Sequence, residues 1–271
     1  MKKVFSYFSR TSLLLIFIFQ ALSSFARQSD SNAQNALFTM HFESTDQNIA
    51  PFISRTLSQR AKTIEHFFGK PFAKKFEVRI LANRAALNTY WSEAWNIPGL
   101  KTECWMVASG TAKELTILSP NAWSEDACEH TIADTLKTQL LLAHELTHVY
   151  HGQYNPQPEF EGLDAIGWFV EGLAVLVSGQ LDAGHLAAAK EAIEHGKAPT
   201  QLANAWSGKY RYGVSGSLVQ YIENRYGREK LISLLSSTSE KEILDELQLT
   251  EQELLTQWQK AVIEQQKSLS H

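Results

Sequence analysis

The most constraining feature of the chain is the run LLLAHELTHVYHG at residues 140–152. His144 and His148 stand four residues apart within mostly apolar surroundings. At this spacing on an α-helix, both imidazoles project from one face and can bind the same metal ion. Glu145 points about 100° further round the helix, so its carboxylate would lie beside the metal and could take a proton from a bound water. The run predicts a helix that carries a zinc site.

A catalytic zinc site needs a third protein ligand and an open fourth position. Glu171 is the candidate, because it stands in residues 164–181, a segment that is apolar on nearly every side. Such a segment predicts a buried helix, in which an unpaired carboxylate is costly. A bound metal ion would explain why a carboxylate stands at position 171 of a buried helix. The alternative is that Glu171 reaches solvent or pairs with an arginine such as Arg211.

Alternating apolar and polar residues predict four strands before this run, at residues 36–42, 76–81, 103–108 and 114–118. The last two are expected to form a hairpin through a turn at residues 109–111. A helix capped by Asp46 should run to about Phe68, and Asn83 should cap a shorter one. Residues 27–35 are polar, and a disordered segment is expected there.

After position 130 the pattern predicts helices. Thr131 and Asp134 have the spacing of a capping box at the start of the metal-binding helix, and Gly152 is expected to end it. Further helices are expected at residues 164–181, 214–226 and 229–235, and behind capping boxes at Ser239 and Thr250. We therefore expect an α+β fold in a single domain over residues 27–271, with a small mixed sheet in residues 27–129 packed on the metal-binding helix and a helical half in residues 130–271.

The N-terminus has the pattern of a secretory signal peptide. Lys2 and Lys3 precede an apolar run at residues 13–19, and Ser24 and Ala26 place small residues at a cleavage site. We expect cleavage after Ala26 and an exported protein, either periplasmic or secreted. The alternative is an uncleaved membrane anchor. No other apolar run is long enough to span a bilayer, so no stable membrane insertion is expected after cleavage.

The two cysteines, Cys104 and Cys128, both follow the predicted cleavage site. In an oxidising compartment an even pair favours a disulfide, although two free buried thiols are the alternative. The formal net charge of −4 comes from mixed signs scattered along the chain, without a basic patch or an RNA-reading motif. Nucleic acid is therefore not expected as a partner.

The HELTH motif followed by WFVEGLA at residues 168–174 resembles the gluzincin peptidases of the thermolysin-like, peptidase MA-like superfamily. The likeness is greatest to small bacterial exported members that have a Glu-Gly-Leu-Ala helix. It extends weakly to residues 210–219 and 249–254 and covers most of the mature chain, but only the two motif helices are specific. The resemblance implies a zincin-like fold and one Zn²⁺ per chain, held by His144, His148 and Glu171.

The resemblance also implies a reaction, the hydrolysis of peptide bonds in a peptide or protein substrate. Glu145 would act as general base, and Tyr212 is our choice for the side chain that stabilises the oxyanion. A tyrosine that merely packs the start of the next helix is the alternative for Tyr212. Residues 114–118 could bind extended substrate by strand pairing at a sheet edge.

Three positions depart from related families. Thermolysin has an aspartate where this chain has Val175, so the group that orients a ligand histidine is unassigned, with Asp164 as a weak candidate. A metzincin would need glycine at position 151 and histidine at 154, whereas the chain has His151 and Tyr154. We expect His151 to be a capping or substrate-side residue rather than a ligand.

A different class of function is compatible with the same fold. The chain could be a non-catalytic extracytoplasmic binding or scaffold protein that retains a zincin fold. Glu145 favours the enzyme, because a structural zinc site is closed by a fourth protein ligand and does not use a neighbouring base. Within the enzyme class, the peptide of the cell wall is an alternative substrate to protein.

Overall fold

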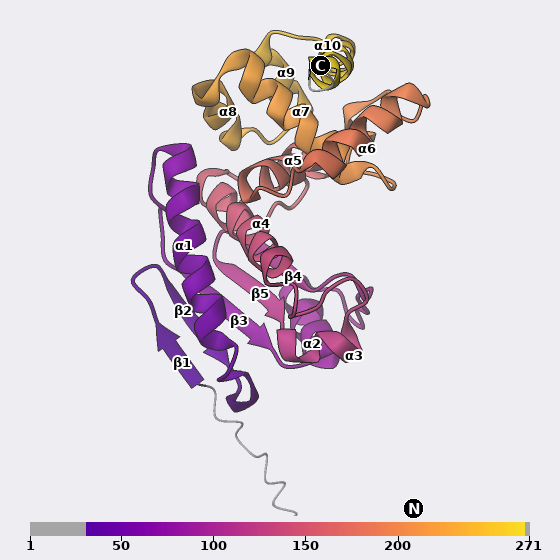
Figure 1. The fold of residues 1–271 in the computed structure, drawn as a ribbon. Helices are drawn as coiled ribbons and strands as arrows, with labels where there is room; N and C mark the ends of the chain where they lie inside the picture. The colour runs from indigo at the N-terminus through magenta and orange to yellow at the C-terminus, as the bar shows by residue number, and fades with distance from the viewer. Residues whose placement is uncertain (1–30, 269–271) are drawn as a thin grey trace, which may run out of the picture.

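The computed structural model describes residues 31–268 of the chain. The predicted signal peptide, residues 1–26, lies outside this range. A small sheet and two helices occupy the N-terminal part, and helices make up the C-terminal half (Figure 1). The expected α+β class, with an N-terminal sheet and a helical C-terminal half, is confirmed.

The sheet has five strands in the order β1-β2-β3-β5-β4. They are β1 (Ser31–Gln34), β2 (Phe38–Phe42), β3 (Phe76–Leu81), β4 (Ala108–Thr111) and β5 (Glu114–Leu118). The three inner strands β2, β3 and β5 are parallel, and the two outer strands β1 and β4 pair antiparallel to their neighbours. The inner strands are those predicted at residues 36–42, 76–81 and 114–118.

Strand β1 corrects the expectation of disorder for residues 31–34, while residues 27–30 lie outside the described part of the chain. Ser31 pairs with Phe42 and Gln34 with Thr39, both in antiparallel register. A polar segment can form such an outer strand because the main chain of β2 supplies its hydrogen-bond partners, and no buried side chain is required. The pattern of apolar residues in the sequence therefore does not predict the pairing of β1 with β2.

The predicted hairpin is present, but its first strand lies later in the sequence. Residues 109–111 were expected to form the turn, whereas they belong to β4, and the turn falls at residues 112–113. The reason lies in Gly110, which faces the helix that carries His144 and His148. A Cβ at Gly110 would lie 2.1 Å from the carbonyl oxygen of Glu145, so only glycine allows this strand to approach the helix so closely.

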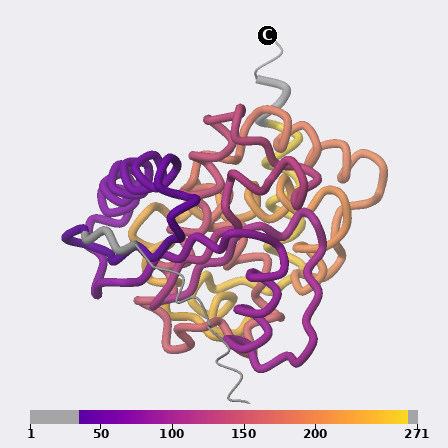
Figure 2. Tube along the Cα trace, turned by 90° about the horizontal axis from the view of Figure 1, so that it is seen from below, coloured from indigo at the N-terminus to yellow at the C-terminus, as the bar shows by residue number. Residues whose placement is uncertain are grey.

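Two helices pack on opposite faces of the sheet. Helix α1 (Ala50–Phe68) lies in front of it in Figure 1, and the indigo end of the chain that carries α1 stands at one edge of the molecule in Figure 2. Helix α2 (Arg84–Ala94) lies on the other face, where Tyr90 and Trp91 donate hydrogen bonds to side chains of β5. Asn83 caps α2 as predicted.

Asp46 does not cap α1, contrary to the expectation. It lies in a short 3-10 helix, η1 (Ser44–Asp46), and its buried carboxylate accepts hydrogen bonds from the Ser119 hydroxyl and the Asn121 amide. Asp46 therefore ties the segment before α1 to the loop after β5, which comprises η2 (Pro120–Ala122) and α3 (Trp123–Asp126).

Helix α4 (Thr135–Tyr154) contains the motif and packs beside α1 on the sheet (Figure 1). Asp134 caps it by accepting a hydrogen bond from the Lys137 N–H. Gly152 does not end the helix as expected, because α4 continues to Tyr154. This glycine instead allows two neighbouring segments to approach the helix closely. A Cβ there would lie 2.7 Å from the Pro158 carbonyl oxygen and 2.8 Å from the Ala112 nitrogen.

The C-terminal half consists of helices that cover α4 on the side away from the sheet (Figure 1). They are η3 (Asp164–Ile166), α5 (Gly167–Ser178), α6 (Ala183–Glu194), η4 (Leu202–Asn204), α7 (Arg211–Tyr226), α8 (Arg228–Ser233), η5 (Leu234–Ser236), α9 (Glu240–Leu247) and α10 (Glu251–Ser268). Helix α6 was not predicted. The capping boxes at Ser239 and Thr250 open α9 and α10 as expected.

In the described part of the chain, no helix combines the length and the apolar character needed to cross a bilayer.

Candidate metal centre

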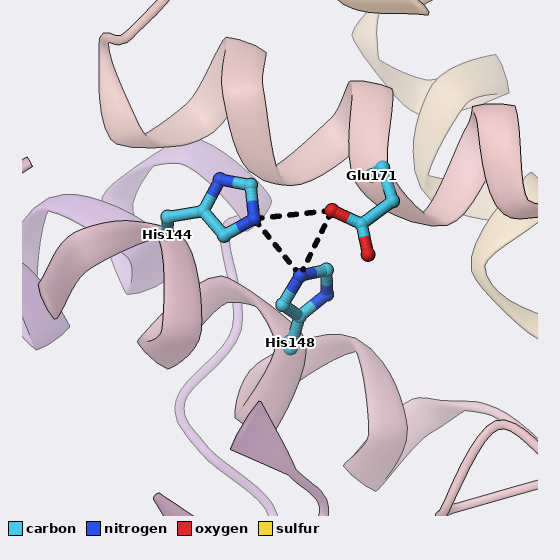
Figure 3. A group of neighbouring side chains, drawn as sticks. All are labelled: His144, His148 and Glu171. Atoms are coloured by element: carbon cyan, nitrogen blue, oxygen red, sulfur yellow. Dashed lines mark hydrogen bonds and ion pairs between the residues drawn. The ribbon is translucent and has the colours of Figure 1, made fainter. Parts of the chain in front are cut away.

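His144, His148 and Glu171 converge in the structure (Figure 3). The Nε2 atom of His144 lies 3.1 Å from Nε2 of His148 and 3.2 Å from Oε2 of Glu171. The remaining separation, from His148 Nε2 to Glu171 Oε2, is 3.6 Å. These are the three side chains that the sequence suggested as metal ligands, and together they form a group that could hold a metal ion.

The three separations fit a tetrahedral zinc site. Zinc binds nitrogen and carboxylate oxygen at about 2.0–2.1 Å, which places two ligand atoms of a tetrahedron about 3.3–3.4 Å apart. The observed separations, from 3.1 to 3.6 Å, bracket that value. Two imidazoles with one carboxylate are also a ligand set that catalytic zinc sites use, with the fourth position left for water or substrate.

Helix packing fixes the position of Glu171. It stands on α5, and the next residue, Gly172, lies where α5 crosses α7. A Cβ at Gly172 would lie 2.4 Å from the Ser215 carbonyl oxygen, so glycine is required for this approach. The Glu171 side chain is 28% exposed. It faces a cleft rather than the fully buried environment that the apolar segment suggested, and no arginine pairs with it among the described residues.

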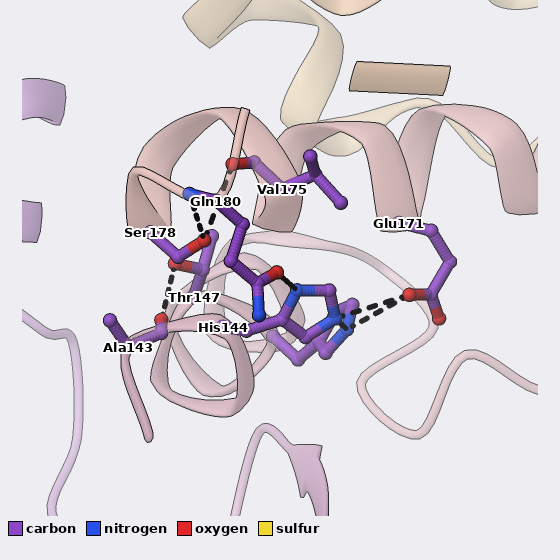
Figure 4. A network of polar contacts seen from close by, with 8 residues as sticks. Ala143, His144, Thr147, Glu171, Val175, Ser178 and Gln180 are labelled. Carbon is purple, nitrogen blue, oxygen red and sulfur yellow. Dashed lines mark hydrogen bonds and ion pairs between the residues drawn. The ribbon is translucent and has the colours of Figure 1, made fainter. Parts of the chain in front are cut away.

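Gln180 orients the first histidine, and the sequence analysis missed it. Its Oε1 atom lies 2.8 Å from Nδ1 of His144 (Figure 4). An amide oxygen only accepts, so Nδ1 of His144 carries the proton and its Nε2 presents a lone pair to the site. Gly179 ends α5 with a φ of 85°, and this turn returns Gln180 to the helix end. Asp164, the residue suggested for this role, is exposed on η3.

The second histidine is held by packing. His148 is 6% exposed, and its ring meets the Phe160 ring at a centroid distance of 5.9 Å. Its Nδ1 atom is buried and has no hydrogen-bond partner among the described residues. The two imidazoles are therefore held differently: a hydrogen bond fixes the tautomer of His144, whereas packing alone fixes the ring of His148.

The carboxylates of the site have opposite pKa shifts. Burial raises the pKa of the Glu145 carboxyl above its usual range, although both histidines and the Gly110 N–H act against this. Burial would also raise the pKa of the Glu171 carboxyl, but the two neighbouring histidines, His148 above all, outweigh it and lower the pKa. Glu171 is therefore ionised, as a metal ligand must be, while Glu145 has the character of a base.

A cleft of about 780 Å³ opens over the three candidate ligands. Its walls come from β4, the loop before β4, α4 and the starts of α6 and α7. The strand at the edge of the sheet is β4, whereas β5 lies between β3 and β4. Residues 114–118 were expected to offer a free edge to substrate, and this is wrong, because both sides of β5 are already paired.

Tyr212 lines the same cleft as the candidate ligands. It is the second residue of α7, half-buried, and its ring meets those of Trp206 and His185 at centroid distances of 4.9 and 6.0 Å. His185 lines the cleft as well, and its Nδ1 lies 2.8 Å from Oδ1 of Asp182. The sequence analysis missed His185, because it belongs to α6, which carries no metal-binding motif.

His151 is neither a capping nor a substrate-side residue. It is fully buried in α4, where its Nε2 donates to the Leu235 carbonyl oxygen and its ring packs against Phe160 and Phe169. Burial lowers the pKa of His151 to about 3, and the nearby His148 adds to this shift. The expectation that it is not a metal ligand agrees with this position, which is outside the group of three.

Comparison with known proteins adds no family to this description. The chain matches no model of a protein family, and a search of curated proteins finds no similar sequence.

Proposed function

We propose that the chain is an exported zinc metallopeptidase that binds one Zn²⁺ through His144, His148 and Glu171. The observation that carries the proposal is the tetrahedral spacing of the three ligand atoms beside the buried Glu145. A structural zinc site is closed by a fourth protein ligand and makes no use of a base. Three ligands with a neighbouring carboxylate are what a hydrolytic site requires.

The chemistry follows from the positions of these groups. When bound, zinc supplies Lewis-acid polarisation of the scissile carbonyl and lowers the pKa of a water. Glu145 takes a proton from the attacking water and returns it to the leaving amine. Its raised pKa suits both steps, because a carboxyl that titrates nearer to neutral pH accepts and releases a proton more evenly.

The oxyanion that forms at the carbonyl needs a hydrogen-bond donor. We assign this role to the Tyr212 hydroxyl, because Tyr212 lines the cleft over the three ligands. His185 is the alternative donor. Its ring also lines the cleft, and Asp182 accepts a hydrogen bond from Nδ1, so that Nε2 would donate to the oxyanion in the imidazolium form of the ring.

The substrate backbone would pair with β4, the edge strand beside α4. Residues 108–111 line the cleft, and an extended peptide can add to such an edge through main-chain hydrogen bonds. This mode of binding favours a peptide over a sugar or a simple ester. It leaves protein and cell-wall peptide as the two sources of that peptide.

Export is supported by the disulfide between Cys104 and Cys128, whose Cα atoms lie 5.4 Å apart. Disulfides of this structural kind form and persist outside the reducing cytoplasm. Together with the signal-peptide pattern of residues 1–26, the disulfide supports a periplasmic or secreted protein. We treat residues 27–271 as a single domain in which the sheet half and the helical half share the site.

The test is made on purified protein that begins at residue 27. It should contain about one zinc per chain and should cleave members of a library of peptides and cell-wall fragments. Glu145→Gln should keep the zinc and lower kcat by a factor of about 10²–10⁴. Glu159→Gln is the matched control, because Glu159 lines the same cleft but pairs with Lys113. Protein without zinc would refute the proposal, and zinc-loaded protein that cleaves nothing would favour a scaffold.

A further inference from the structure

Arg211 is the first residue of α7, and its guanidinium lies in the cleft over the candidate metal centre. Three aromatic rings surround it. The guanidinium carbon lies 5.4 Å from the ring centroid of Trp105, 5.8 Å from that of Trp206 and 5.1 Å from that of Tyr212. These contacts hold the cation in place, since such rings attract a cation through their faces.

Within residues 31–268, the guanidinium of Arg211 has no carboxylate partner. Among the described residues, no ion pair or side-chain hydrogen bond includes it, although several carboxylates line the same cleft. Lys137, which lines the same cleft, differs in this respect. Nζ of Lys137 lies 3.6 Å from Oδ2 of Asp134. The charge-assisted donors of Arg211, which lines the cleft, are therefore not occupied by any carboxylate of the described residues.

The wall that carries Trp105 is fixed from behind. Arg84 donates hydrogen bonds to the main-chain carbonyls of Cys104, Met106 and Asp126, so it joins the loop before β4 to the segment after α3. The Cys104–Cys128 disulfide joins the same two segments. Trp105 is 43% exposed, yet its backbone is held on both sides. A rigid wall keeps Arg211 oriented before any ligand arrives, which lowers the entropic cost of binding.

We propose that Arg211 binds a carboxylate group of the substrate and so determines specificity in the cleft. A planar guanidinium presents paired N–H donors that match the two oxygens of a carboxylate. The aromatic rings shield this contact from water, which strengthens it. That the carboxylate belongs to a substrate rests on the proposed peptidase function. The carboxylate site itself rests only on the position and surroundings of Arg211.

The carboxylate has two sources in a peptide, its C-terminus or an acidic side chain. Four probes separate them: N-acetyl-Ala-Ala-Phe-Ala as the free acid and as the C-terminal amide, and N-acetyl-Ala-Ala-Glu-Ala-amide with its Gln counterpart. Binding is measured by quenching of tryptophan fluorescence, because Trp105 and Trp206 touch Arg211. Zinc-loaded protein with Glu145→Gln is used, so that bound peptide is not consumed.

We expect one of the two acid probes to bind tighter than its neutral counterpart by about tenfold to a hundredfold, the effect of a charge-assisted hydrogen bond. Arg211→Gln should remove that preference, and Arg211→Lys should keep part of it. Arg225→Gln is the matched control. Arg225 lies on the same helix, and its guanidinium carbon is 5.8 Å from the Tyr226 ring centroid, but it does not line this cleft.

The wild-type comparison of acid with neutral probes needs no substitution at Arg211, so misfolding of Arg211→Gln cannot hide the answer. Equal affinity for acid and neutral probes, or no binding of either acid at millimolar concentration, overturns the proposal. A preference that persists in Arg211→Gln also overturns it. An arginine that only supports the aromatic rings would lower stability on substitution and leave the acid-to-amide ratio unchanged.

The two proposals fail in different ways. If Arg211-dependent binding of an acid probe is found but the protein with Glu145 intact cleaves no peptide, the carboxylate site stands and the peptidase is refuted. If acid and amide peptides are cleaved equally and Arg211→Gln changes neither KM nor kcat, the peptidase stands and the carboxylate site is refuted. A carboxylate site in an active peptidase predicts a change in KM with little change in kcat.

Discussion

The side-chain amide oxygen of Gln180 lies 2.8 Å from Nδ1 of His144, and this contact selects the tautomer that turns Nε2 toward Glu171. Gln180→Ala should weaken zinc binding by about 10- to 100-fold, because groups that orient a ligand histidine have effects of that size. Gln180→Glu keeps an acceptor at the same place and should retain most of the affinity. Competition with a chromophoric chelator measures both. Equal affinity for wild type and Gln180→Ala would refute the role.

Gly172 should tolerate no side chain, because it lets α5 cross α7. Gly172→Ala places a methyl group 2.4 Å from the Ser215 carbonyl oxygen and should destabilise the fold by about 1–3 kcal/mol. Gly167→Ala is the matched control, since it lies on the same helix with nothing within 4 Å of the added carbon. Urea unfolding of both variants gives the comparison. A stable Gly172→Ala variant would mean that the two helices separate easily.

His151 should make the protein sensitive to acid. The pKa of His151 is lowered to about 3 in the folded state, so below pH 6.5 the unfolded chain takes up a proton that the folded chain does not. This contribution to stability is present above pH 6.5 and is lost as the pH falls toward 3. At pH 4.5 the loss amounts to about 2–3 kcal/mol.

The variant His151→Phe isolates this effect, because it retains an aromatic ring between Phe160 and Phe169. It gives up the hydrogen bond to Leu235 and should be less stable than wild type at neutral pH. That difference should shrink as the pH falls from 7 to 4.5. Urea titrations at several pH values measure it, and a constant difference would show that His151 is not buried in its neutral form.

The disulfide should contribute both stability and the shape of the cleft wall. It joins Cys104 to Cys128 across a separation of 24 residues, and opening such a loop costs about 3 kcal/mol on the chain-entropy account. The double variant Cys104→Ser with Cys128→Ser should unfold at lower urea concentration. The carbonyl contacts of Arg84 remain in it, so the fold should persist. An unchanged unfolding midpoint would contradict this contribution.

Local periodicity predicted which three side chains form the candidate metal-binding group. His144 and His148 are one helical turn apart, and Glu171 stands out in an apolar helix, so the sequence alone indicated both. The inner strands followed from the alternation of apolar residues. The Cys104–Cys128 disulfide was also predicted and is confirmed.

What the sequence did not reveal depends on close approaches between distant segments. Gly110 reads as a turn residue, whereas it is the point where a strand touches a helix. Gly152 likewise suggests the end of a helix, whereas it allows the close approach of Pro158 and Ala112. Gln180 reaches His144 only because Gly179 reverses the chain there. None of these contacts can be recognised from the neighbouring sequence, because each depends on a partner residue that lies in another segment of the chain.

The contact at Gly110 also bears on how this protein could change in evolution. The strand that would hold substrate and the helix that holds the metal ligands meet there at backbone distance, and the same N–H contacts Glu145. Neither element can shift without moving the other, so β4 and the candidate ligands of α4 form one structural unit. The rim around Trp105 and Arg211 is held by separate contacts. Substitutions at the rim can therefore alter the cleft wall without moving the three candidate ligands.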